Sequence, residues 1–150
     1  MSLRVFFHHS KNNAIASSDF YKMLTNYKNL DNTKLDANFN KNALKNVNHN
    51  LESIRKSHGM VLVRDSHCDL SQFYLAYAYC QVPNLPVFYA IENSDIFQVN
   101  NKLMETVKKN TQFHYYDKAF NVESNLYYWL NKLNHKYFPE NHKQFIDRDI

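Results

Sequence analysis

Glycine is almost absent from this chain, which holds one glycine, Gly59, among 150 residues. Walker A loops and dinucleotide-binding fingerprints need several glycines at fixed offsets, because the backbone must approach a phosphate closely. The sequence therefore excludes the glycine-rich phosphate loops. Cysteine is also scarce. Cys68 and Cys80 form neither a C-x-x-C pair nor a disulfide framework, which favours a reducing compartment.

Long apolar runs are missing too. No run reaches the roughly 18 residues that a membrane-spanning helix needs, and the start "MSLRVFF" lacks the long apolar core of a signal peptide. We therefore expect a cytoplasmic protein without a membrane partner. The net charge is +4, but the lysines are scattered along the chain. Nucleic-acid binding needs a clustered basic face, so we do not expect a nucleic-acid partner.

The length and composition are those of one ordinary globular domain. A chain of 150 residues is large enough for a single core. Hydrophobic residues make up 44% and charged residues 21%, which is typical of such domains. We expect one domain over residues 1–150, with a polar, loosely packed C-terminal tail from about residue 139.

Short runs of aromatic, β-branched and other apolar residues predict strands. Four such runs are Leu3–His8, Met60–Val63, Pro86–Ile91 and Phe113–Tyr116. The second is apolar throughout, as in a parallel strand that is buried on both faces. The polar segment 31–42 fits either a further short strand or a loop.

Between these runs, apolar residues recur at three- and four-residue intervals, which is typical of helices with one buried face. We predict helices over Ser18–Leu30, Leu44–Ile54, Asp69–Ala78, Ile96–Val107 and Val122–Tyr137. Gly59 is predicted to end the second helix in a left-handed conformation. Strands that alternate with helices predict a three-layer α/β sandwich with a five-stranded, mainly parallel sheet of flavodoxin-like or Rossmann-like type.

In such a sheet, ligands bind beyond the carboxyl ends of the strands. Three segments follow predicted strands at this edge: His8–Lys11, Arg64–Asp69 and Glu92–Asp95. His8, His9 and Lys11 carry groups suited to a phosphate or carboxylate, although a solvated loop with one inward histidine explains them equally simply. Glu92 is a further candidate for contact with a ligand.

The stretch "HCD", residues 67–69, has the side-chain types that bind zinc. Adjacent residues rarely point at one ion, and structural sites use spaced pairs, so we expect no metal and no cofactor. A nucleophilic role for Cys68 would need a nearby histidine, which no spacing in the sequence specifies.

Residues 50–79, "NLESIRKSHGMVLVRDSHCDLSQFYLAYAY", resemble the central segment of the nucleoside 2-deoxyribosyltransferase family. That family has an "L-x-x-I" helix, a buried strand, an acid-bearing loop and an "E-L-G-Y-A" helix before a "K-P-V" strand. Here "Y-L-A-Y-A", Tyr74–Ala78, takes the place of "E-L-G-Y-A", and "L-P-V" begins the next strand. "N-K-L-M", Asn101–Met104, resembles the family's "N-L-M" motif.

The resemblance implies chemistry on the N-glycosidic bond of a nucleoside or nucleotide, without a cofactor. In the family, a glutamate attacks the anomeric carbon and forms a covalent sugar intermediate, as in retaining glycosidases. By this resemblance Asp69 matches the loop acid and Asn101 the assisting asparagine, which often serves a neighbouring subunit. It therefore also implies a homo-oligomer. Tyr74 occupies the place of the nucleophilic glutamate.

No Asp or Glu occurs between Asp69 and Glu92, so no shift of register gives this helix a carboxylate. Three interpretations stay open. The chain binds a nucleoside or nucleotide without transfer, or Tyr74 acts as a phenolic nucleophile, or another acid, namely Asp65, Asp69 or Glu92, has taken over. An interaction module of TIR-like or flavodoxin-like fold is the alternative from a different class. Assays on deoxynucleosides and their monophosphates separate the two classes.

Overall fold

The structure, a computed structural model, describes residues 2–10, 19–30, 47–65, 69–94 and 101–140. Its strands are β1 (Val5–His9), β2 (Gly59–Arg64), β3 (Val87–Glu92) and β4 (Thr111–Tyr116). Its helices are α1 (Asp19–Thr25), α2 (Val47–Arg55), α3 (Asp69–Gln81), α4 (Asn101–Val107) and α5 (Glu123–Tyr137), with a 3-10 turn, η3 (Ala119–Val122), before α5. All neighbouring strands are parallel, in the order β1-β2-β3-β4.

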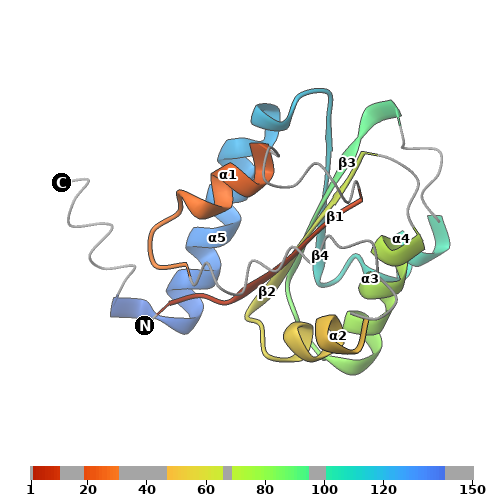
Figure 1. Ribbon diagram of the computed structural model, residues 1–150, viewed down its shortest axis with the longest axis horizontal. Coiled ribbons are helices and arrows are strands. Elements are labelled where there is room, and N and C mark those ends of the chain that lie inside the picture. Colours follow the sequence, from red (N-terminus) through yellow and green to blue (C-terminus); the bar gives the residue numbers. More distant parts are fainter. Residues whose placement is uncertain (1, 11–18, 31–46, 66–68, 95–100, 141–150) are drawn as a thin grey trace.

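Helices cover both faces of the sheet (Figure 1). α1 and α5 lie on one face, and α2, α3 and α4 lie on the other. β1 and β2 are buried along their whole length because each strand is covered on both sides. Successive residues alternate between the two cores. The α1–α5 side takes Val5, Phe7, Val61, Val63, Phe88 and Ala90, and the α2–α3 side takes Phe6, Met60, Leu62, Val87, Tyr89 and Ile91.

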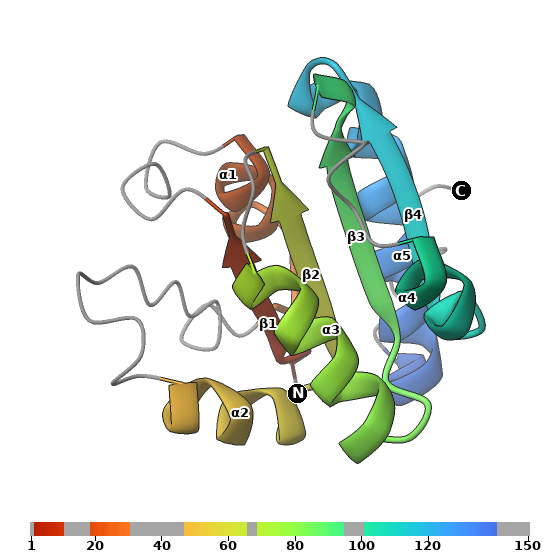
Figure 2. The same cartoon turned by 90° about the vertical axis from the view of Figure 1, so that its right-hand side faces the viewer.

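A single parallel bridge between Leu3 and Leu30 adds to the topology. The Leu3 amide donates to Asn29 (2.7 Å), whereas the Arg4 carbonyl accepts from the His58 amide (2.7 Å) just before β2. Backbone groups of consecutive strand residues point to opposite sides, so Leu30 lies on the edge of β1 away from β2. After β1, the chain thus first places Leu30 on one side of β1 and then β2 on the other side, as in flavodoxin-like folds. Figure 2 shows the four strands side by side, with β1 and β4 at the two edges.

The four runs predicted as strands are confirmed, and the sheet is parallel. The prediction of five strands is wrong for the described residues, which contain four. The segment 31–42, where a fifth strand or a loop was expected, lies outside the described residues. None of the described helices combines the length and the hydrophobicity that crossing a bilayer requires.

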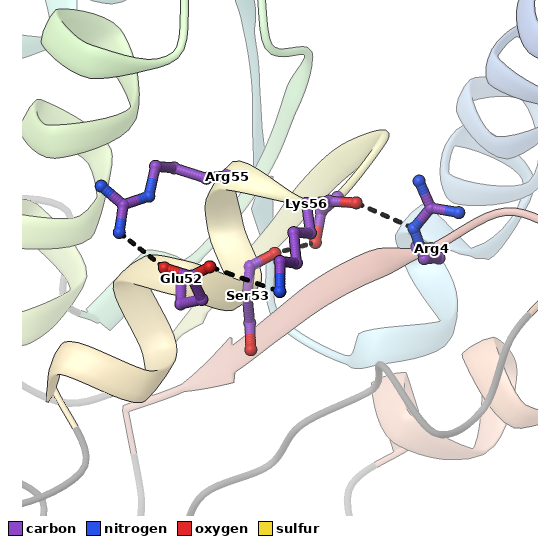
Figure 3. Close-up of polar contacts among 6 residues, drawn as sticks. Arg4, Glu52, Ser53, Arg55 and Lys56 are labelled. Carbon is purple, nitrogen blue, oxygen red and sulfur yellow. Dashed lines mark hydrogen bonds and ion pairs between the residues drawn. The ribbon is translucent and has the colours of Figure 1, made fainter.

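The beginning of β1 is joined to the end of α2 through polar contacts. The Arg4 guanidinium Nε donates to the Lys56 carbonyl (2.8 Å), and the Arg4 amide donates to His58 Nδ1 (2.9 Å). Glu52 pairs with Arg55 (2.7 Å) and with Lys56 (3.3 Å) on the surface of the same turn (Figure 3). Exposed pairs of this kind stabilise little, so the backbone contacts of Arg4 fix this junction.

Gly59 does not end a helix in a left-handed conformation, as the sequence suggested. It is the first residue of β2, it is buried, and no described glycine has a positive φ. A Cβ at this position would lie 2.7 Å from Leu133 Cδ1 and 2.8 Å from Trp129 Cη2. Glycine is therefore needed because α5 packs closely against the start of β2.

Gly59→Ala is expected to lower the free energy of unfolding by about 1–3 kcal/mol, because the added methyl overpacks the contact with α5. Urea denaturation of the two proteins measures the difference. The matched control is Ala76→Gly on α3, a half-buried site that changes helix propensity without touching α5. A Gly59→Ala protein as stable as the parent would contradict the close contact.

Candidate functional site

Polar side chains gather at the carboxyl ends of β1 and β2, which is the switch point of the sheet. His8 and His9 are consecutive strand residues, so their side chains point to opposite faces. His9 has the parity of Phe7 and faces the α1–α5 side, whereas His8 has the parity of Phe6 and faces the α2–α3 side. The edge therefore carries two separate groups of polar residues, one on each face.

The first group, the Asp65 cluster, consists of His9, Ser10 and Asp65. The Ser10 hydroxyl donates to Asp65 Oδ1 (2.8 Å) and accepts from the Asp65 amide (3.0 Å). His9 Nε2 lies 3.5 Å from Asp65 Oδ2. The Ser10 amide donates to the Val63 carbonyl (2.9 Å) and so continues the β1–β2 pairing by one residue. These contacts fix the direction of the Asp65 carboxylate.

The Asp65 carboxylate remains accessible although it is held. Its side chain is 15% exposed, against 5% for the side chain of His9. A carboxylate has two oxygens with about four acceptor positions. A partly desolvated carboxylate in a fixed direction is suited to accept charge-assisted hydrogen bonds from ligand hydroxyls.

The second group, the Tyr74 cluster, consists of Asn50, Tyr74 and His8. Tyr74 is 1% exposed, and its hydroxyl accepts a hydrogen bond from Asn50 Nδ2 (2.9 Å). Its ring stands edge-on to His8, with centroids 5.1 Å apart, and to Phe6, at 5.5 Å. The rings of Phe6 and His8 thus pack against the ring of Tyr74, and the Asn50 amide contacts its hydroxyl.

His8 is uncharged at neutral pH. Burial, and to a smaller extent the nearby His9, together lower its pKa from 6.5 to about 4. The sequence pointed to His8 as one of the groups for a charge-assisted bond to phosphate. In the folded protein His8 offers at most a neutral donor, so any positive charge for a phosphate comes from other residues.

Arg64 is a site residue that the sequence analysis did not single out. It is fully buried and is the largest such side chain in the described residues. It shares the parity of Met60 and Leu62, which pack under α3. The guanidinium stays protonated at any accessible pH, so Arg64 brings a permanent positive charge to this edge. The sequence feature that could have identified Arg64 is its place directly after the apolar run Met60–Val63.

The α2–α3 face holds two further buried polar side chains. Ser71, in the first turn of α3, is fully buried, and among the described residues its Oγ has no hydrogen-bond partner. Tyr89, in β3, is also fully buried. Buried polar atoms are costly unless they are paired. These two hydroxyl groups therefore add a polar component to this core that apolar packing alone does not require.

Three of the remaining predicted residues, Asp69, Glu92 and Asn101, each lie at the end of a helix or strand. Asp69 is the first residue of α3, the place predicted for a helix cap. Glu92 ends β3, half-buried, and accepts a hydrogen bond from the Ser94 hydroxyl (3.1 Å). Asn101 is exposed at the first residue of α4. Lys11, His67 and Cys68 lie outside the described residues.

Within the described part of the chain, no three His, Cys, Asp or Glu side chains converge as a metal site requires. The Asp65 cluster has two such groups, His9 and Asp65, with Ser10 as the third member. Hydroxyl recognition, proton transfer or electrostatic stabilisation are the kinds of chemistry that this set of groups supports. No family model, curated protein or solved structure matches the chain.

Proposed function

We propose that this protein binds a nucleoside or nucleotide at the carboxyl ends of β1 and β2. It would be a divergent relative of the nucleoside 2-deoxyribosyltransferases in which cleavage or transfer at the N-glycosidic bond is weak or lost. The observation that carries the proposal is the Asp65 carboxylate. It is held by Ser10, lies beside His9, and is partly exposed at the switch point of the sheet.

Asp65 recognises the sugar in this proposal. Doubly wound folds that bind NAD use an acidic side chain to accept a hydrogen bond from the ribose 2′-hydroxyl. A 2-deoxy sugar lacks that group, so here Asp65 would accept from the 3′- or the 5′-hydroxyl. Asp65 follows β2 directly and its side chain is 15% exposed, so a ligand hydroxyl can reach the carboxylate. Arg64 lies on the other face of the sheet and is fully buried, so it does not take part in this recognition of the sugar.

Tyr74 is poorly suited to replace the glutamate of the family. A phenol has an ordinary pKa of about 10 and needs a nearby base to become a nucleophile. The Asn50 amide donates a hydrogen bond to the Tyr74 hydroxyl, and the side chain is 1% exposed, so a phenolate and an attacked sugar would have to be accommodated inside the core. Covalent transfer through Tyr74 is therefore not supported by its surroundings.

Asp65 supports a slow hydrolysis instead. A water molecule would attack the anomeric carbon while Asp65 takes its proton, and the bond from that carbon to the base nitrogen would break. The base nitrogen receives a proton from solvent, so atoms and charge balance. General-base help of this kind contributes roughly 100- to 10,000-fold, which is far less than a complete site provides.

The proposal includes a homo-oligomer. Asn101, which matches the asparagine that serves a neighbouring subunit in the family, is exposed where α4 begins. Phe73 is exposed by 46% and Tyr115 by 41%. Exposed aromatic residues are enriched at protein–protein interfaces, so the surface is compatible with contact between copies.

Asp65→Asn is expected to weaken nucleoside binding at least tenfold, because the neutral amide loses the charge-assisted bonds to the sugar and offers one acceptor oxygen. Isothermal titration calorimetry with a panel of deoxynucleosides and their monophosphates measures the effect. A tenfold change corresponds to about 1.4 kcal/mol. Hydrolysis and base exchange are followed on the same panel by chromatography.

Asp117→Asn is the matched control. Asp117 is an exposed acid that follows β4 and is held by the Asn93 amide (2.8 Å), so the same isosteric change is made at the same edge of the sheet. It should leave affinity unchanged. If no member of the panel binds, or if both variants bind like the parent, an interaction module without a nucleoside site becomes the better assignment.

A further inference from the structure

Two adjoining cavities open at the amino ends of the strands, where β3 and β4 begin. Their volumes are about 430 and 190 Å³. They share the lining residues Pro86, Gln112, Trp129 and Lys136. Pro86 precedes β3 and Gln112 is the second residue of β4, whereas Asp65 follows the carboxyl end of β2. In a parallel sheet the amino ends and the carboxyl ends of the strands lie on opposite sides, so the two cavities are separate from the proposed nucleoside site.

Four lysines line these cavities, and their described lining residues include no Asp or Glu. Lys108 and Lys109 follow α4, and Lys132 and Lys136 stand one turn apart on α5. By contrast, a cavity of about 350 Å³ between α1 and α5 combines Lys22 with Asp19 and Glu123. The lysines that look scattered in the sequence are gathered by the fold where the end of α5 meets the α4–β4 turn.

The contacts of these lysines do not neutralise the cavities. Lys108 pairs with Glu105 at 2.9 Å, but both side chains are well exposed, and such pairs are weak. The ammonium groups of Lys132 and Lys136 lie 4.8 and 5.2 Å from the ring centres of Tyr128 and Tyr137. A ring attracts a cation without cancelling its charge, so the positive charge stays available to a ligand.

Lysines near helix C-termini also interact favourably with the helix dipole, which accounts for basic residues at the ends of α4 and α5. That effect falls off within the last turn and does not explain why the larger cavity is also lined by polar side chains. The polar groups come from Asn84, Asn110, Thr111 and Gln112. A cavity lined by ammonium groups together with amide and hydroxyl donors is typical of an anion-binding site.

The geometry points to a binding site for a small anion that carries two or more linked phosphates, supplied as a nucleoside triphosphate or as inorganic polyphosphate. A chain of several phosphates suits this site because the ammonium groups come from two separate segments, the α4–β4 turn and α5. The larger cavity has a volume within the range of small-molecule sites. This site does not depend on the Asp65 site, and either can be correct without the other.

The test is calorimetry on the full chain with inorganic tripolyphosphate and with ATP, in low salt and at physiological salt. Tripolyphosphate should bind to one site, and Lys109→Glu combined with Lys136→Glu should weaken binding at least tenfold. All of the changed side chains are exposed, so the fold should be kept, and thermal unfolding followed by circular dichroism checks this. Tighter binding of ATP identifies the nucleotide as the source, and equal binding identifies the phosphate chain itself.

The matched control combines Lys56→Glu on the α2 turn with Lys118→Glu after β4, two exposed lysines outside both cavities, and makes the same change in net charge. It should retain most of the affinity. The proposal fails if the control weakens binding as much as the cavity variant, since net charge alone would then explain the effect. It also fails if tripolyphosphate binds no better than sulfate, or if a single-stranded RNA dodecamer binds through the same lysines more tightly than either phosphate compound.

Discussion

Lowering the pH from 7 to 4 is expected to reduce the free energy of unfolding by about 3 kcal/mol through His8 alone. The pKa of His8 is about 4 in the folded protein against an ordinary value of 6.5, chiefly because the ring is buried. Below pH 6.5 the His8 ring therefore binds a proton in the unfolded chain, whereas in the folded chain it binds one only near pH 4. Each unit of difference is worth about 1.36 kcal/mol, and stability falls progressively across that window.

Urea unfolding at pH 7 and pH 4 measures this loss, and two variants separate His8 from the carboxylates that also titrate. His8→Gln should be less stable than the parent at pH 7 and should lose about 3 kcal/mol less between the two pH values. His49→Gln, at an exposed position on α2, should show the same pH dependence as the parent. Equal pH dependence in all three proteins would mean that His8 is not held neutral.

The strands were predictable because their signals are local and strong. Runs such as Met60–Val63 are apolar at every position, and this pattern has one economical explanation in a parallel sheet with two covered faces. The boundaries moved by one or two residues, as at β4, which begins at Thr111 rather than Phe113. Where the chain was polar, as in segment 31–42, no local signal distinguished a strand from a loop.

Gly59 shows what local signals leave out. A glycine after a helical pattern is most often a C-cap, yet here the reason for glycine is the approach of Trp129 and Leu133, about seventy positions later in the sequence. Arg64 is similar. An arginine that ends a strand usually reaches solvent, and its complete burial depends on how α3 covers the sheet. Contacts between distant segments decide both cases.

The position of the polar side chains at the strand ends was predictable, but their contacts with one another were not. The rule that ligands bind beyond the strand ends pointed to His8, His9 and Asp65. The two-residue period of a strand already separates the two histidines onto opposite faces, and the structure confirms that separation. The pairing of Ser10 with Asp65 spans 55 positions in the chain and has no counterpart in the sequence pattern.

The protein is expected to show little or no deoxyribosyl transfer, and Tyr74→Phe should not change that result. The hydroxyl of Tyr74 accepts a hydrogen bond from the Asn50 amide inside the core, where the side chain is 1% exposed and a sugar has little access to it. Removing it leaves the Asn50 amide without this acceptor, so Tyr74→Phe should lower the free energy of unfolding by about 1–2 kcal/mol. Base exchange followed by chromatography measures the activity. Strong transfer in the parent that Tyr74→Phe abolishes would make the tyrosine the nucleophile.

Tyr74→Glu is expected to cause the largest loss of stability, about 3–5 kcal/mol. The glutamate fills less space than the ring that packs against Phe6 and His8, and it places a carboxyl group where the side chain is 1% exposed. A buried carboxylate with few partners is costly. Tyr79→Glu is the matched control on the same helix, because Tyr79 is 43% exposed and should tolerate the change within about 0.5 kcal/mol.

The activity of Tyr74→Glu tests whether the residues around position 74 can support a nucleophile. Asn50 donates to the tyrosine hydroxyl and would donate equally to a carboxylate, so one contact for a nucleophile is already in place. If base exchange appears in Tyr74→Glu but not in Tyr79→Glu, the residues around position 74 support a nucleophile, as the proposed relation to the transferases requires. If the variant is destabilised as expected and remains inactive under conditions where it is folded, the surrounding residues have adapted to the tyrosine, and Asp65 is left as the acid around which the site works.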